Sequence, residues 1–142
     1  MDWTIEFDKA IEQYLPDLEV LQDEPMSRHT TFRIGGPAKR MAFPSSREQL
    51  VLLMSFAKDY GANPLVIGNG SNLLVPDEGL DRLVIDTSAN LNRVERGSGN
   101  TVLADAGATL ARTADLACKS GLTGLEFAHG IPGTVGGAVY MN

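Results

Sequence analysis

Two glycine-rich segments contain the residues whose types and spacing are best suited to chemistry. The first separates two apolar runs, at 65–67 and 73–75, with small polar residues. Successive backbone N–H groups in such a loop can point into one concavity and hold phosphate oxygens without a cationic side chain. A glycine-rich connection between strands, with no ligand, is the alternative. The loop consists of Gly68, Asn69, Gly70, Ser71 and Asn72.

This loop matches neither of two common nucleotide-binding motifs. The dinucleotide fingerprint G-x-G-x-x-G requires a glycine at position 73, where Leu73 stands, and a helix after it. The P-loop requires Gly-Lys followed by Ser or Thr, and no lysine lies near. In an anion-binding loop, the absence of a side chain at Gly70 would leave room for a phosphate. We therefore expect valine at this position to fill the phosphate space.

The second segment, at 130–137, is also depleted of side chains, which would let a large flat ligand approach the backbone closely. Tight packing of strands or helices is the alternative. An extended, diphosphate-containing cofactor that lies across both segments would explain why one short chain has two of them. The residues expected to line it here are Gly130, Ile131, Pro132, Gly133, Thr134, Gly136 and Gly137.

Helices and strands must position these segments, and the hydrophobic pattern predicts both. Apolar residues on one helical face, with Tyr14 among them, predict a helix over 7–15 that is ended by Pro16. The same spacing predicts a second helix over 45–60. Ser45 and Glu48 match a capping box for the second helix, and Gly61 suits a left-handed end to it.

A third helix is expected over 110–120, with Thr109 as its N-cap and Gly121 past its end. Polar connections are predicted at 22–30 and 88–100. Strands are predicted at 31–34, 37–44, 65–67, 73–75, 82–86 and 101–104. The fold class is therefore mixed α/β, as one folded unit with two lobes.

Composition excludes several classes of partner. The net charge is −6 and the sequence pI is about 4.8, which argues against nucleic acid and anionic membranes as partners. No segment approaches the ~20 consecutive apolar residues that span a bilayer. The N-terminus carries acids where a signal peptide has basic residues, and the single Cys118 cannot form an internal disulfide. The sequence therefore predicts a cytoplasmic protein.

Three motifs, at 29–38, 68–79 and 121–142, occur in an order and spacing that resemble the UDP-N-acetylenolpyruvoylglucosamine reductase (MurB) family of bacterial flavoenzymes. The resemblance runs from about residue 24 to the last residue. It implies an α/β (α+β) FAD-binding domain of the vanillyl-alcohol-oxidase and p-cresol-methylhydroxylase (PCMH) type, with two subdomains that hold FAD between them. In that fold a loop like 68–72 lies on the FAD pyrophosphate. The cofactor-binding residues proposed above are then expected to contact FAD.

The resemblance also implies a division of the chain. We expect a helical appendage at 1–23, a first FAD-binding subdomain at 24–75, and a truncated second subdomain at 76–142.

By the same resemblance, the activity is that of an NADPH-dependent flavin oxidoreductase. NADPH would reduce FAD, and hydride would then pass to the enolpyruvyl group of a UDP-sugar to give UDP-N-acetylmuramate, a peptidoglycan precursor. In the family, a serine acid, an arginine and a glutamate complete the site, and all three follow the last motif. We therefore expect no catalytic residue among these 142 residues, and no reductase activity from them alone.

Two other readings stay open. Instead of a flavin-binding portion of the reductase, the chain could be a cofactor-free remnant that retains only the fold. The other alternative is a FAD-linked oxidase of the same fold. The longer enzyme is expected to be a monomer, and exposed apolar residues at 139–141 are expected to promote self-association of the fragment.

Other reactive residue types are assigned no chemistry. His29 and His129 have no Asp, Cys or second His at metal-binding spacing, so no metal is expected. Cys118 is expected to be a small core residue, and Arg33 is either near the flavin or in a structural ion pair. The acids at 77–78 fit a solvated turn.

Overall fold

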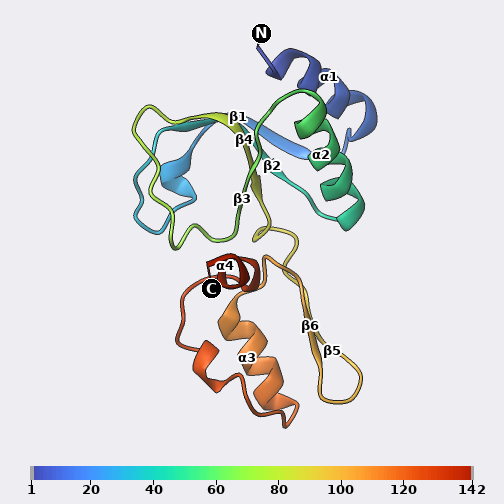
Figure 1. The fold of residues 1–142 in the computed structure, drawn as a ribbon, viewed down its shortest axis with the longest axis vertical. Helices are drawn as coiled ribbons and strands as arrows, with labels where there is room; N and C mark the ends of the chain where they lie inside the picture. The colour runs from blue at the N-terminus through green and yellow to red at the C-terminus, as the bar shows by residue number, and fades with distance from the viewer. Residues whose placement is uncertain (1, 142) are drawn as a thin grey trace.

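The structure is a computed structural model, and it describes residues 2–141. Figure 1 shows two lobes: one contains a sheet with two helices, and the other contains a hairpin and two further helices. In chain order the elements are α1 (Thr4–Tyr14), β1 (Glu19–Pro25), the 3-10 helix η1 (Met26–Arg28), β2 (Pro37–Phe43), α2 (Arg47–Asp59), β3 (Leu65–Ile67), β4 (Leu80–Asp86), β5 (Val94–Arg96), β6 (Val102–Ala104), α3 (Leu110–Lys119), the 3-10 helix η2 (Glu126–Ala128) and α4 (Val135–Met141).

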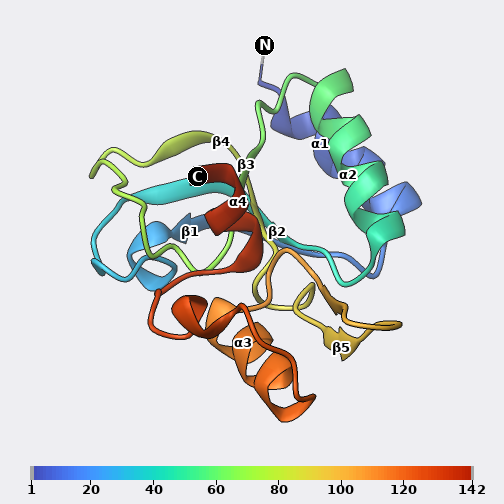
Figure 2. The same ribbon diagram turned by 60° about the horizontal axis from the view of Figure 1, so that its bottom comes forward.

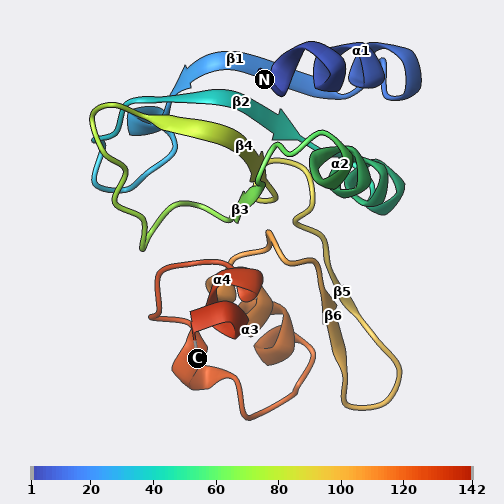
Figure 3. The same cartoon turned by 45° about the horizontal axis from the view of Figure 1, so that its top comes forward.

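The sheet of the first lobe has the strand order β1-β2-β4-β3. β1 runs antiparallel to β2, whereas β2, β4 and β3 run parallel. Successive side chains of the central strands point to opposite faces. Ala42, Leu83 and Ile85 pack in a cluster with α1 and α2, which lie side by side in Figures 1 and 3. Met41 and Val84 pack on the other face, against loop residues, so both faces of the sheet are covered.

The predicted helices of this lobe form, with one shift. The Ser46 hydroxyl oxygen, not that of Ser45, caps α2 by accepting a hydrogen bond from the Gln49 N–H at 3.1 Å. The N–H and hydroxyl of Ser45 instead donate to the Gln49 side-chain oxygen, at 2.8 and 3.1 Å. Gly61 follows α2 with φ +71°, as predicted. Tyr14 was predicted on the apolar face of α1 but is exposed.

Two predicted strands are absent from the described residues, and two strands were missed. Segment 31–34 is irregular, with Arg33 at φ +56°. Segment 73–75 is not a strand, and its apolar character reflects burial of Val75 beneath the sheet. β1 was predicted as a polar link because it is an edge strand with exposed polar side chains. β5 lies in a short hairpin with β6.

The second lobe packs α3 against this hairpin. Figure 2 shows the hairpin projecting beside α3. The Thr109 hydroxyl oxygen caps α3 by accepting a hydrogen bond from the Arg112 N–H at 3.2 Å, and Gly121 follows with φ +70°. Both features confirm the prediction. Cys118 is exposed, so its expected place in the core was wrong.

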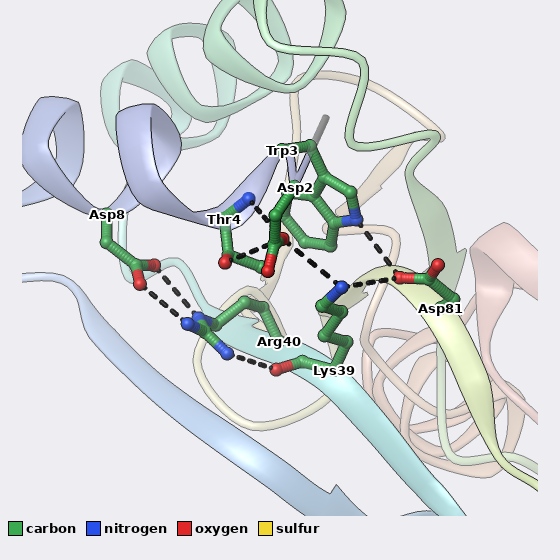
Figure 4. A network of polar contacts seen from close by, with 7 residues as sticks. All are labelled: Asp2, Trp3, Thr4, Asp8, Lys39, Arg40 and Asp81. Carbon is green, nitrogen blue, oxygen red and sulfur yellow. Dashed lines mark hydrogen bonds and ion pairs between the residues drawn. The ribbon is translucent and has the colours of Figure 1, made fainter.

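A polar network fastens the start of α1 to the sheet (Figure 4). Lys39 Nζ lies 3.2 Å from Asp2 Oδ1 and 3.1 Å from Asp81 Oδ1. The indole N–H of Trp3 donates to Asp81 at 3.3 Å. Hydrogen bonds from the Thr4 N–H and hydroxyl, and then from Lys39, lower the pKa of Asp2 to about 2. Hydrogen bonds to Asp81 and Asp2 in turn raise the pKa of Lys39.

A second link makes α1 part of the first lobe. The Arg40 guanidinium on β2 donates two hydrogen bonds to the Asp8 carboxylate, from Nε at 2.9 Å and Nη2 at 2.6 Å. Phe7 is fully buried in the cluster between the helices and the sheet. The expected division of the chain at residues 23 and 75 stays a prediction. The sheet itself joins β1, which spans position 23, to β4, which follows position 75.

Candidate functional site

A cavity of about 470 Å³ lies between the two lobes. On the first lobe, the cavity wall contains the loop that comes after β3 in the chain and Thr87, which comes after β4. The wall therefore lies at the carboxyl ends of two parallel strands, where open α/β sheets bind ligands. All residues of the predicted first loop line it. So do all predicted residues of the second segment except Gly130. The lining residues are Leu65, Val66, Ile67, Gly68, Asn69, Gly70, Ser71, Asn72, Leu73, Thr87, Ala106, Leu110, Ile131, Pro132, Gly133, Thr134, Gly136, Gly137, Ala138, Tyr140 and Met141.

The loop at 68–72 offers free hydrogen-bond donors to this cavity. Within the described residues, the backbone N–H groups of 69–72 donate to no protein acceptor. The cavity lining has no charged side chain. Unpaired N–H groups in a loop next to a cavity suit an anion that needs backbone donors. The arrangement therefore fits the diphosphate part of a dinucleotide.

Two neighbouring segments hold this loop in place. The N–H and hydroxyl of Thr87 both donate to the Ile67 carbonyl, each at 3.0 Å, just before the loop begins. The N–H of Thr31 donates to the Gly70 carbonyl at 3.2 Å. The loop is thus fixed from β4 on one side and from the 29–36 segment on the other.

The missing side chain of Gly70 is required by the packing of the loop and not by space in the cavity, so the predicted reason for this glycine was wrong. Its φ is +67°, and a Cβ built on it would lie 2.0 Å from the carbonyl oxygen of His29. A side chain would therefore collide with the neighbouring backbone and would not enter the cavity. Valine at this position would disturb the loop itself.

Close packing also accounts for two other glycines of the site, between the lobes at Gly68 and within the second lobe at Gly136. A Cβ on Gly68 would lie 2.2 Å from the hydroxyl oxygen of Thr134, and Thr134 is only 2% exposed. A Cβ on Gly136 would lie 2.9 Å from that of Ala106. Tight packing, the alternative named for the second segment, therefore applies at Gly136. At Gly130, which lies outside the cavity, no atom is within 4 Å of a built Cβ.

Backbone hydrogen bonds set the second segment against the start of α3. Leu110 N–H donates to the Gly133 carbonyl at 3.1 Å, and Val135 N–H donates to the Ala108 carbonyl at 2.8 Å. Gly136 N–H donates to the Ala106 carbonyl at 2.8 Å. These bonds place the segment opposite the 68–72 loop.

The remaining sequence candidates lie outside the cavity. Arg33 is exposed and does not line it. His129 Nε2 lies 3.1 Å from Asp115 Oδ1 on the surface. Within residues 2–141 no group of three or more His, Cys, Asp or Glu side chains is arranged to hold a metal ion. Over the same residues, no helix combines the length and apolar character that a membrane crossing requires.

Sequence reasoning missed several lining residues, of which Thr87 is the most informative. It directly follows a predicted strand, at the end where ligands bind in parallel sheets, and this position was the available signal. Ala106, Leu110, Tyr140 and Met141 carry no comparable signal, because only the packing of the lobes brings them to the cavity.

Comparison with known families decides the nature of the domain. Residues 38–142, which include both glycine-rich segments, match the family described as FAD binding domain. The chain belongs to this FAD-binding family. Solved structures of low identity share the fold, for example an alkyldihydroxyacetonephosphate synthase at 24% identity with a TM-score of 0.60, over 82% of this chain and 25% of that one. The expected PCMH-type FAD-binding fold is therefore confirmed.

Individual relatives confirm the resemblance found in the motifs. The chain is 47% identical over 133 residues to a UDP-N-acetylenolpyruvoylglucosamine reductase of Caldicellulosiruptor bescii, covering 92% of this chain and 42% of the relative. A reductase of the same name from Moorella thermoacetica is 51% identical over 125 residues, covering 88% and 41%. The crystal structure of the Thermus caldophilus reductase (MurB) is 34% identical, with a TM-score of 0.59, over 86% of this chain and 41% of that chain. The chain thus spans less than half the length of these relatives.

Proposed function

We propose that the chain is the FAD-binding portion of an NADPH-dependent UDP-N-acetylenolpyruvoylglucosamine reductase. The cavity between the lobes carries this proposal, because its wall presents the unpaired backbone N–H groups of 69–72 in a domain of the FAD-binding family. Relatives at 47% and 51% identity with this name support the choice of reaction.

In the proposed complex, Gly68, Asn69, Gly70, Ser71 and Asn72 hold the FAD diphosphate through backbone and side-chain donors. The opposite wall, which includes Ile131, Pro132, Gly133, Thr134, Gly136 and Gly137, would lie along the ribityl or isoalloxazine part, with Gly130 at its outer end. When bound, FAD would accept hydride from NADPH and supply it to the UDP-sugar. The chain's own part is to hold and orient the cofactor and to exclude water from it.

The proposed reaction gives UDP-N-acetylmuramate, so the cellular role would be peptidoglycan precursor synthesis, and through it cell wall biogenesis, cell shape and cell division. We place it in the cytoplasm, with NADPH and the UDP-sugar as partners. The net charge of −6 supports partners other than nucleic acid and anionic membranes. The longer enzyme would be a monomer.

Equilibrium dialysis, which measures the FAD bound by a protein, tests the proposal on two proteins. One is the 142-residue chain, for which we expect weak retention of flavin or none. The other is a hybrid in which this chain replaces the matching part of the Moorella thermoacetica relative, for which we expect a yellow protein that retains FAD. A well-folded hybrid that binds no FAD would refute the proposed function.

A further inference from the structure

Three poorly accessible side chains meet behind the 68–72 loop. His29 Nε2 lies 2.9 Å from Glu24 Oε1, and His29 Nδ1 lies 4.0 Å from Asp86 Oδ2. The side chains of Glu24, His29 and Asp86 are only 12%, 19% and 8% exposed. The ring of Phe43 lies 5.9 Å from that of His29. The ends of β1, β2 and β4 therefore converge on one imidazole.

The backbone next to this imidazole supports the loop directly. The Cα of Gly70 rests on the carbonyl group of His29 so closely that a Cβ would lie 2.0 Å from its oxygen. Two residues further on, the N–H of Thr31 donates to the Gly70 carbonyl. On the other side, Thr87 follows Asp86 and holds the Ile67 carbonyl. Both sides of the loop are thus held by residues adjacent to the Glu24, His29 and Asp86 group.

Other polar contacts leave His29 as the link between the two carboxylates. Asp86 Oδ1 accepts hydrogen bonds from the N–H and hydroxyl of Ser88, so its other oxygen faces the imidazole. Arg28 lies 3.7 Å from Glu24, but its side chain is 70% exposed, and such an ion pair is worth little. Neither His29 nor its two carboxylate partners line the cavity, so they act on a ligand only through the loop.

We propose that His29 is a positioning residue, which keeps the 68–72 loop in its anion-binding shape through its contacts with Glu24 and Asp86. The hydrogen bond to Glu24 fixes the imidazole, and the imidazole fixes the backbone at 29–31 on which Gly70 rests. The inference rests on the proposed function only in naming the FAD diphosphate as the anion.

The first test needs no flavin. Heteronuclear NOE values are measured for the amides of Asn69, Gly70 and Ser71 in the whole chain. His29→Ala and Glu24→Ala are expected to lower these values. Glu24→Gln, which keeps an acceptor for the imidazole, is expected to preserve them. His129→Ala is the matched control, since this histidine pairs with exposed Asp115 on the surface. Wild-type values in His29→Ala, with the fold intact by circular dichroism, would overturn the proposal.

The second test compares FAD with riboflavin, which has no phosphate, in the hybrid protein. Loss of well-placed donors to a charged diphosphate should weaken FAD binding by about tenfold or more in His29→Ala. Riboflavin binding should change much less. An equal loss for both ligands would mean general damage to the fold and would also overturn the proposal. If the wild-type hybrid binds no FAD, the proposed function fails, and the NOE values alone decide the role of His29.

Discussion

At the scale of single residues, the glycines of the cavity differ in the neighbour that a side chain at their position would meet. The Cβ direction at Gly70 leads to the His29 carbonyl, and that at Gly68 leads to Thr134. These directions depend on which segments pack together, so the sequence could locate the glycines but could not assign their roles. The expectation that one extended ligand lies across both segments stays a prediction, and the structure brings both segments to one cavity.

Gly70→Ala is therefore predicted to weaken the fold and the site together. Alanine at φ +67° costs about 1–2 kcal/mol from the left-handed backbone alone. The overlap with the His29 carbonyl adds to this cost. We expect a clear fall in the free energy of unfolding, measured by urea denaturation, and a loss of FAD from the hybrid.

Gly61→Ala is the matched control for this prediction. Gly61 has φ +71°, but nothing lies within 4 Å of a built Cβ. Gly61→Ala should lower the free energy of unfolding only by the cost of alanine at a positive φ. It adds no collision with a neighbouring residue, and the hybrid should keep its FAD. Equal destabilisation by the two substitutions would mean that the contact between Gly70 and His29 carries no energetic weight.

At the scale of the elements, local signals predicted the helices well and the strands less well. Caps and stop residues such as Thr109 and Gly61 act within a few residues, so the sequence shows them directly. Strand formation depends on distant partners. β1 is polar but pairs with β2, whereas the apolar run 73–75 forms no strand, and only its Val75 is buried beneath the sheet.

The attachment of α1 to the sheet is predicted to weaken at acid pH. The pKa of Asp2 is lowered from its usual value of 3.8 to about 2 in the folded protein. The stabilisation from this carboxylate is therefore fully present above pH 3.8 and is lost as the pH falls towards 2. Trp3, the single tryptophan, lies in the same network and reports the loss by its fluorescence.

Asp2→Asn tests this prediction. The variant should lack the part of the fluorescence transition that occurs between pH 3.8 and 2, because its side chain does not titrate. Thr4, which donates to Asp2, lies in the same turn, so helix content is followed by circular dichroism in parallel. An unchanged acid transition in the variant would rule out Asp2 as its source.

At the scale of the whole molecule, the cavity wall continues into an exposed apolar surface. On α4, Val139 is 75% exposed, Tyr140 is 88% exposed and Met141 is 62% exposed. Contiguous exposed apolar residues favour association in water. We predict that the chain self-associates with increasing concentration, measured by sedimentation velocity.

Val139→Ser combined with Tyr140→Ser should shift the chain towards the monomer. Ile5→Ser is the control, because Ile5 is also exposed, at 57%, but lies on α1. An equal shift in both variants would point to general hydrophobicity rather than to α4.

The last prediction concerns activity. Reduction of the UDP-sugar requires a positioned acid, which typically contributes about 10²–10⁴-fold to the rate. The cavity lining has no charged side chain, and the resemblance places the serine, arginine and glutamate of the family after the last motif. We therefore expect no measurable oxidation of NADPH by these 142 residues with added FAD and UDP-N-acetylenolpyruvoylglucosamine. The hybrid, which brings those groups from its relative, should turn over. A rate for the chain within about tenfold of the hybrid's would exceed what the loss of a general acid allows, and would show that catalytic groups lie within the chain.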